Sequence, residues 1–173
     1  MIQKTGDLSA NEMEQMILLV MNGGATLKEV HGISEDAMEN IYAHAYQCYQ
    51  SGKLHEAERF FKFLCMYDLK NPDYFIGLGA VYQLSKNYLK ACDIYALAYV
   101  LADKNFIPVF FSGQCQLLLG NIAKALQCFD IIIRRCEDET LIKRAVAYSE
   151  TIRKNHAESM QSNNGSPSEE DAD

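Results

Sequence analysis

The residue types that most often perform chemistry are scattered along this 173-residue sequence. His55-Glu56 lacks the second histidine of a zinc-binding H-E-x-x-H helix, and "GLGAVY" (77–82) lacks the third glycine of a dinucleotide-binding loop. The acidic pairs Glu35-Asp36 and Glu137-Asp138 stand where helices are expected to begin, and there carboxylates stabilise the helix dipole. We therefore expect no catalytic residues, no metal and no cofactor, and we do not expect an enzyme.

The six cysteines show neither a C-x-x-C pair nor the spacing of metal ligands. Most of them lie in apolar helical stretches, where a free cysteine behaves as a small hydrophobic residue. Free thiols are typical of a reducing cytosol. We therefore expect core residues, as we do for His44, and not a disulfide framework: Cys48, Cys65, Cys92, Cys115, Cys128 and Cys136.

The charge balance argues against a nucleic-acid partner. The formal net charge is −7 and the pI is about 5.1, whereas a phosphate-binding surface is basic. Residues 1–154 hold all 16 basic residues and 18 of the 23 acidic ones, so the part expected to fold is nearly neutral. The apolar run "MILLVM" (16–21) is too short for a signal peptide or a membrane span. These features predict a soluble intracellular protein, with no membrane partner.

The clearest regularity is a repeat with a period of 34 residues. Four columns share this step: Ala57, Ala91 and Ala125; Phe61, Tyr95 and Phe129; Leu54, Tyr88 and Ile122; Ala45, Gly79 and Gly113. A period of 34 is that of the tetratricopeptide repeat, a pair of antiparallel helices. The small residues allow the two helices of a repeat to approach closely, and the aromatic residues fill the space beside them.

These columns predict an all-α fold of three tetratricopeptide-like repeats in a short solenoid, at about 38–71, 72–105 and 106–137. The expected helices cover residues 36–50, 54–67, 73–85, 88–101, 107–119 and 122–135. Turns are expected at Gly52, Lys86-Asn87 and Gly120. Residues 138–156 are expected to form a C-terminal capping helix, and residues 157–173 a disordered acidic tail.

Residues 1–35 are expected to hold an N-terminal amphipathic helix and its connection to the repeats. One face of this helix is apolar and rich in methionine: Met13, Met16, Ile17, Val20 and Met21. Such a face can cap the first repeat or form a homodimer contact, because methionine packs well against irregular partners. The sequence favours neither alternative.

The functional prediction is a peptide-binding groove. In tetratricopeptide arrays the first helices of successive repeats line a concave surface. The predicted groove stripe is mostly apolar and aromatic: Tyr42, Tyr46 and Tyr49, then Ile76, Ala80 and Gln83, then Ile107, Phe110, Gln114 and Leu117. Tyrosine suits peptide recognition because it offers a rigid ring and a hydroxyl group at small entropic cost. Alternatively, the tyrosines pack beneath the N-terminal helix.

Several strings resemble a specific family, the class II chaperones that serve the translocator proteins of bacterial type III secretion systems. The resemblance covers roughly residues 12–152 and is closest to the invasion-type branch of enteric bacteria. It is carried by "GATLKEVHGIS" (24–34), "YAHAYQCYQSGKLHEAERFFKFLCMYD" (42–68), "GLGAVYQL" (77–84), "PVFFSGQCQLLLG" (108–120) and "EDETL" (137–141).

The resemblance implies a cytoplasmic chaperone that binds two hydrophobic translocators and keeps them unassociated and competent for secretion. It implies that an extended client segment of the P-x-L-x-x-P kind docks in the groove, where Tyr42, Tyr46 and Tyr49 match the family's groove tyrosines. It also implies a homodimer through the N-terminal helix and, in some members, joint action with an AraC-type activator.

Two other functions remain open. A generic tetratricopeptide adaptor that docks a C-terminal carboxylate would need Lys, Arg and Asn on the groove stripe, which argues against it. A transcriptional co-regulator that acts through a partner, without contacting DNA itself, is compatible with the chaperone function.

Overall fold

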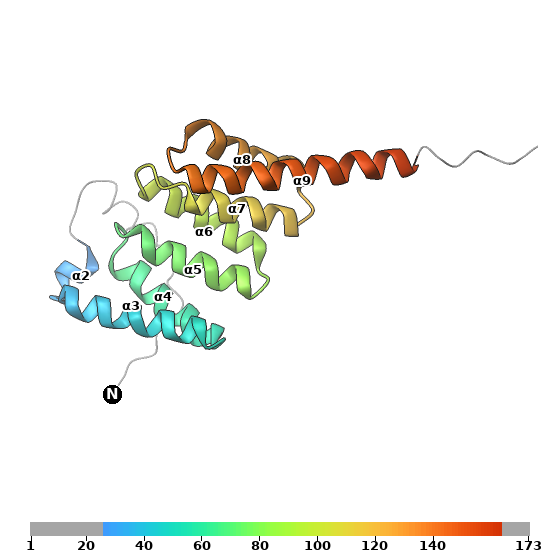
Figure 1. Ribbon diagram of the computed structural model, residues 1–173. Coiled ribbons are helices and arrows are strands. Elements are labelled where there is room, and N and C mark those ends of the chain that lie inside the picture. Colours follow the sequence, from blue (N-terminus) through green and yellow to red (C-terminus); the bar gives the residue numbers. More distant parts are fainter. Residues whose placement is uncertain (1–25, 164–173) are drawn as a thin grey trace, which may run out of the picture. The chain divides into compact units, whose positions relative to one another are not determined.

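The computed structural model describes residues 26–163, and within this range the chain is entirely helical (Figure 1). The helices are α2 (Leu27–Val30), α3 (Glu35–Gln50), α4 (Leu54–Tyr67), α5 (Pro72–Leu84), α6 (Tyr88–Leu101), α7 (Ile107–Leu118), α8 (Ile122–Arg135) and α9 (Glu139–Asn163). The six central helices match the predicted ranges to within one residue at each end. The predicted class, helix pairs of the tetratricopeptide type, is confirmed.

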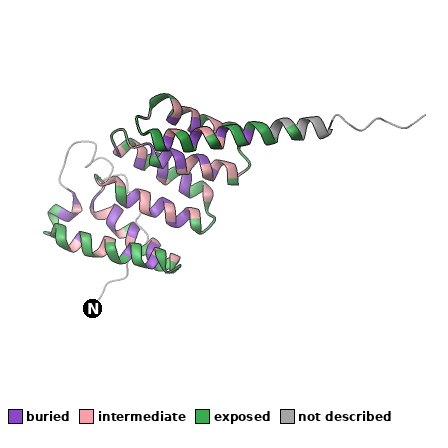
Figure 2. Cartoon of the chain, viewed as in Figure 1, coloured by how far each residue is buried: buried purple, intermediate pink, exposed green. Residues whose placement is uncertain are grey.

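The chain forms two compact units. The first extends to Ala102 and contains the helix pairs α3–α4 and α5–α6, preceded by α2. The second begins at Asp103 and contains the pair α7–α8, with α9 packed against α8. Figure 2 shows buried and exposed residues alternating along the helices of each unit, the pattern of amphipathic helices.

The turn between the two helices of each pair contains one residue in the left-handed region, and these residues are 34 positions apart. Gly52 has a φ of 73°, Lys86 of 61° and Gly120 of 76°. This conformation ends a helix and reverses the chain, and glycine adopts it without steric cost. The predicted turns are therefore present, with a lysine in the middle pair where the other two have glycine.

The small residues at the repeated position, Gly79 and Gly113, allow an aromatic ring to pack directly against the helix backbone, as predicted. A Cβ atom on Gly79 would lie 2.5 Å from the ring of Tyr95, and one on Gly113 would lie 3.0 Å from the ring of Phe129. Both rings are fully buried. Gly77 performs the same function toward the preceding helix, because its Cβ would lie 2.1 Å from the ring of Phe61.

Two elements differ from the sequence prediction. The short helix α2 was not predicted, although Thr26 and Glu29 form a capping box that marks its start. Helix α9 continues to Asn163, so the prediction that a disordered tail begins at residue 157 is wrong for residues 157–163. These residues contain good helix formers, and the first glycine and proline beyond them are Gly165 and Pro167.

Candidate functional site

The three predicted groove tyrosines lie along α3 in different environments. Tyr42 is half-buried, and its ring lies edge-on to Phe61, with 5.9 Å between centroids, and beside Tyr74 of α5 at 5.6 Å. Burial, together with the nearby Asp73 carboxylate and Tyr46, raises the pKa of Tyr42. Through these ring contacts Tyr42 anchors α3 to α5.

Tyr46 and Tyr49 form the accessible part of this row. Their rings are stacked, with centroids 6.1 Å apart and an angle of 30° between planes. Tyr46 is 48% exposed, and Tyr49 is half-buried. Two adjacent tyrosine rings thus offer an apolar surface with hydroxyl groups, which suits contact with an extended peptide.

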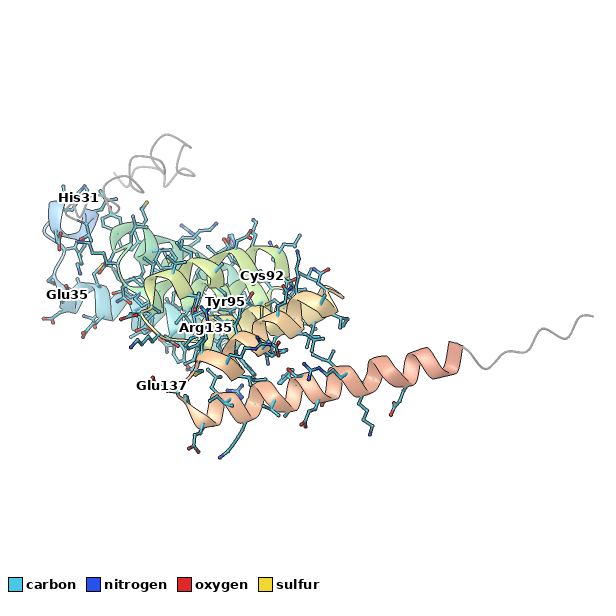
Figure 3. The ribbon with its side chains drawn as sticks, turned by 90° about the horizontal axis from the view of Figure 1, so that it is seen from above. His31, Glu35, Cys92, Tyr95, Arg135 and Glu137 are labelled. Carbon is cyan, nitrogen blue, oxygen red and sulfur yellow. The ribbon has the colours of Figure 1, made fainter. Side chains whose placement is uncertain are left out.

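Helix α5 contributes the next predicted groove residues. Ile76 and Ala80 are half-buried, so each retains some accessible surface. Gln83 accepts a hydrogen bond from the hydroxyl of Tyr95, with 2.8 Å between Oε1 and Oη. Tyr95 is buried in the helix pair (labelled in Figure 3). The core therefore fixes the orientation of the Gln83 amide.

The second unit departs from the prediction at Phe110. Ile107 is exposed as expected, but Phe110 is only 1% exposed. Its ring lies between Phe129 and Tyr148, with centroid distances of 5.6 and 5.4 Å, and the guanidinium of Arg144 lies 4.3 Å above it. The prediction that Phe110 lines an open groove is therefore wrong, because α9 covers this part of α7.

Gln114 and Leu117 instead face a surface that α7 shares with α9. The Gln114 amide donates a 2.8 Å hydrogen bond to the Tyr148 hydroxyl. Leu117 lines a pocket of about 620 Å³ formed by the end of α7, the start of α8 and the middle of α9. The other residues lining this pocket are Ile122, Ala147, Tyr148, Thr151, Ile152 and Asn155. The sequence prediction missed all six, although Tyr148 lies one 34-residue period after Gln114.

A buried ion pair was also missed. The Lys28 ammonium of α2 lies 2.8 Å from Asp68 and 2.6 Å from Glu35, and hydrogen bonds to these two carboxylates raise the pKa of Lys28 well above its ordinary value. Lys28 and Asp68 are both buried. This pair attaches α2 to the end of α4, and it marks a structural contact and not a reactive group.

The chemistry-bearing residues form no reactive cluster in the described range. The six cysteines all lie in this range and form no disulfide there, and four of them are buried. The prediction that His44 is a core residue is wrong, because His44 is exposed on α3 with its ring edge-on to Phe60.

Residues 26–163 contain no group of three potential metal ligands in suitable positions. No helix in this range has the length and apolar character of a membrane span.

The predicted dimer or cap residues lie outside the described range. These are Met13, Met16, Ile17, Val20 and Met21. Their two alternative functions therefore stay predictions.

Comparison with known proteins identifies the family. The tetratricopeptide repeat family matches residues 38–71 and 72–105. The chaperone protein SicA of Salmonella typhimurium is 51% identical over 147 residues, which span 85% of this chain and 89% of SicA. The chain belongs to the class II chaperones of type III secretion translocators. This family is non-enzymatic, as the sequence predicted.

Solved structures of class II chaperones have the same fold. PcrH of Pseudomonas aeruginosa, in complex with the chaperone binding region of PopD, is 31% identical with a TM-score of 0.66, covering 72% of this chain and 97% of PcrH. SycD of Yersinia enterocolitica, in complex with a peptide of the translocator YopD, is 29% identical with a TM-score of 0.66, covering 72% of this chain and 98% of SycD.

Proposed function

We propose that this class II chaperone binds two hydrophobic translocator proteins in the bacterial cytoplasm and keeps them apart and competent for secretion. The observation that carries the proposal is the stacked tyrosine pair on α3, in which Tyr46 is exposed and Tyr49 is half-buried. These are the positions at which the family resemblance places the groove tyrosines. The complexes of PcrH with PopD and of SycD with a YopD peptide support the same client class.

The proposed ligand is an extended client segment of the P-x-L-x-x-P kind. Prolines hold such a segment extended before it binds, so little conformational entropy is lost on docking. The accessible parts of the Tyr46 and Tyr49 rings provide apolar contact, and their hydroxyl groups can bond to the peptide backbone. The described part of the proposed stripe lacks the Lys and Arg residues that an adaptor for C-terminal carboxylates uses.

Co-expression with neighbouring open reading frames tests this proposal. The full chain should retain a translocator through purification, and the double variant Tyr46→Ala/Tyr49→Ala should lose it while helical content is unchanged. The double variant Leu97→Ala/Val100→Ala is a matched control, because it removes exposed apolar surface from α6 (42% and 79% exposed) outside the proposed groove. Retention of the translocator by the tyrosine variant would contradict the groove assignment.

We further propose, from the family resemblance, a homodimer through residues 9–22 and a co-activator function with an AraC-type regulator. The acidic balance of the chain means that the activator, and not the chaperone, would contact DNA. A promoter reporter that responds to the activator alone as strongly as to the activator with the chaperone would contradict the second proposal.

A further inference from the structure

We infer that an apolar face of α6 binds residues 9–22 of a second copy of the chain, with the two helices running in the same direction. This inference rests on the proposed homodimer and names the surface that its N-terminal helix contacts. The α6 face consists of Leu89, Leu97 and Val100, which are 65%, 42% and 79% exposed. All three residues belong to the first compact unit.

The composition of α6 indicates that this face is covered by another element. Helix α6 contains only two charged residues, Lys90 and Asp93, and is otherwise apolar or aromatic on every side. A helix that is apolar all round is normally buried all round. One side of α6 is buried in its helix pair, through Ala91, Tyr95 and Ala98. The residues of the α6 face follow one another at intervals of eight and three positions, so they form a second apolar stripe on the same helix.

The charges beside the α6 face complement those of the N-terminal segment. Lys86 and Lys90 are exposed at the start of α6. Residues 5–27 contain no basic residue, and Glu12 and Glu14 lie in the first half of the predicted helix, one on each side of its apolar face. Helices docked in the same direction bring these carboxylates to the two lysines. Docking in the opposite direction brings them to the end of α6, which has no basic residue. Flanking charges of this kind set the orientation of paired helices.

The short connection to α2 favours a second copy over the same chain. Residues 23–25 span at most about 14 Å between residue 22 and Thr26. Helix α2 packs on α4, where the Lys28 ammonium lies 2.8 Å from the Asp68 carboxylate. The N-terminal segment therefore joins the first unit beside α4. We assign the α6 face to the helix of a second copy for this reason.

Reciprocal docking gives a closed dimer of sufficient area. Stable interfaces bury about 1,600 Å² in total, which is more than one contact between two short helices provides. When each copy places residues 9–22 on α6 of the other, the contact is made twice. A two-fold axis then relates the copies. Both α6 faces are occupied in this dimer, so no apolar face is left for further copies.

An exchange of charges between the two helices tests the inference. Lys86→Glu/Lys90→Glu and Glu12→Lys/Glu14→Lys each bring like charges together, so each should weaken the dimer at least tenfold. The two double variants combined restore opposite charges and should return the dissociation constant of the dimer to within threefold of wild type. Sedimentation equilibrium of the full chain measures these constants at low salt, where charge screening is weak.

A charge control and an apolar variant accompany this exchange. Lys53→Glu/Lys70→Glu makes the same change in net charge at two exposed lysines of the first unit outside α6, and it should dimerise within twofold of wild type. Leu89→Asp/Val100→Asp puts two carboxylates on the α6 face and should weaken the dimer at least tenfold. It should still retain the translocator on co-expression. Circular dichroism checks the folding of each variant.

Three results would overturn the inference. One is a wild-type dimer constant in the α6 variants, or no recovery in the combined charge variant. If Met16→Asp/Ile17→Asp dissociates the dimer and the α6 variants do not, the proposed homodimer stands and only its contact surface is wrong. Loss of the translocator from Leu89→Asp/Val100→Asp, with an unchanged dimer mass, would assign the α6 face to the client. A wild-type chain that stays monomeric would overturn both the inference and the proposed homodimer.

Discussion

The side-chain amide of Gln114 donates a hydrogen bond to the hydroxyl of Tyr148, one repeat period of 34 residues further along the chain. The ring of Tyr148 also packs against Phe110 and Phe129, with centroids 5.4 and 5.1 Å away. One side chain of α9 thus joins both helices of the preceding pair. Helix α9 therefore packs on the α7–α8 pair as a further repeat helix would, in addition to capping that pair.

Two substitutions at Tyr148 separate the hydrogen bond from the ring packing. Tyr148→Phe keeps the ring and should lower the free energy of unfolding by about 1 kcal/mol, the usual contribution of one hydrogen bond. Tyr148→Ala removes the ring as well and should cost about 3 kcal/mol. Urea unfolding of the full chain, followed by circular dichroism, measures both values. Equal losses would show that the ring contacts contribute nothing.

Substitution of the helix glycines should destabilise the protein in an order set by the available space. Gly79→Ala places a methyl group 2.5 Å from the buried ring of Tyr95, whereas Gly113→Ala meets Phe129 only at 3.0 Å. Overpacking of a core costs about 1–3 kcal/mol, so we expect Gly79→Ala near the upper end and Gly113→Ala near the lower end. Thermal unfolding of the two variants gives the order, and the reverse order would contradict the packing described here.

The repeat columns explain why the six central helices could be predicted closely. A small residue, glycine or alanine, packs opposite an aromatic ring, and both recur every 34 residues. This pattern identifies the helix pairs and the faces through which they contact each other. The same columns predicted the exposure of Phe110 wrongly, because that exposure depends on whether α9 covers the residue. The repeat pattern in α9 is too degenerate for its packing to be predicted from sequence. The pocket was missed for that reason as well.

Removal of the Lys28 ammonium should be strongly destabilising. Both Lys28 and Asp68 have only about a tenth of their side-chain surface exposed (11% and 10%), so Lys28→Met leaves a buried carboxylate without its partner. We expect a loss of about 3 kcal/mol, as for other broken buried pairs. The double variant Lys28→Met/Asp68→Asn should recover most of this loss, since the amide oxygen of the new side chain could still accept from the Lys70 N–H as the Asp68 carboxylate does. No recovery would contradict the idea that the unpaired Asp68 carboxylate causes the loss.

The same pair predicts a dependence of stability on alkaline pH. Hydrogen bonds to Asp68 and Glu35 raise the pKa of Lys28 in the folded protein, so folding favours the protonated form. The stabilisation is therefore complete below the unfolded-state pKa, ~10.4, and is lost as the pH rises through the higher folded-state value. Wild type should lose more stability between about pH 9.5 and 11.5 than Lys28→Met/Asp68→Asn does, as measured by urea unfolding. Parallel curves would contradict this.

Substitutions on the predicted apolar face of the N-terminal helix can show whether it forms a dimer contact or caps the first repeat. The double variant Met16→Asp/Ile17→Asp puts two carboxylates on a face of five apolar residues, and burying them in an interface would be costly. If this face forms the homodimer, sedimentation equilibrium should show a fall from dimer to monomer mass with the helical content retained. Gln15→Asp is the matched control, because it adds a carboxylate beside that face and should leave the mass unchanged. An unchanged mass in the double variant, with a lower unfolding temperature, would instead assign the face to capping the first repeat.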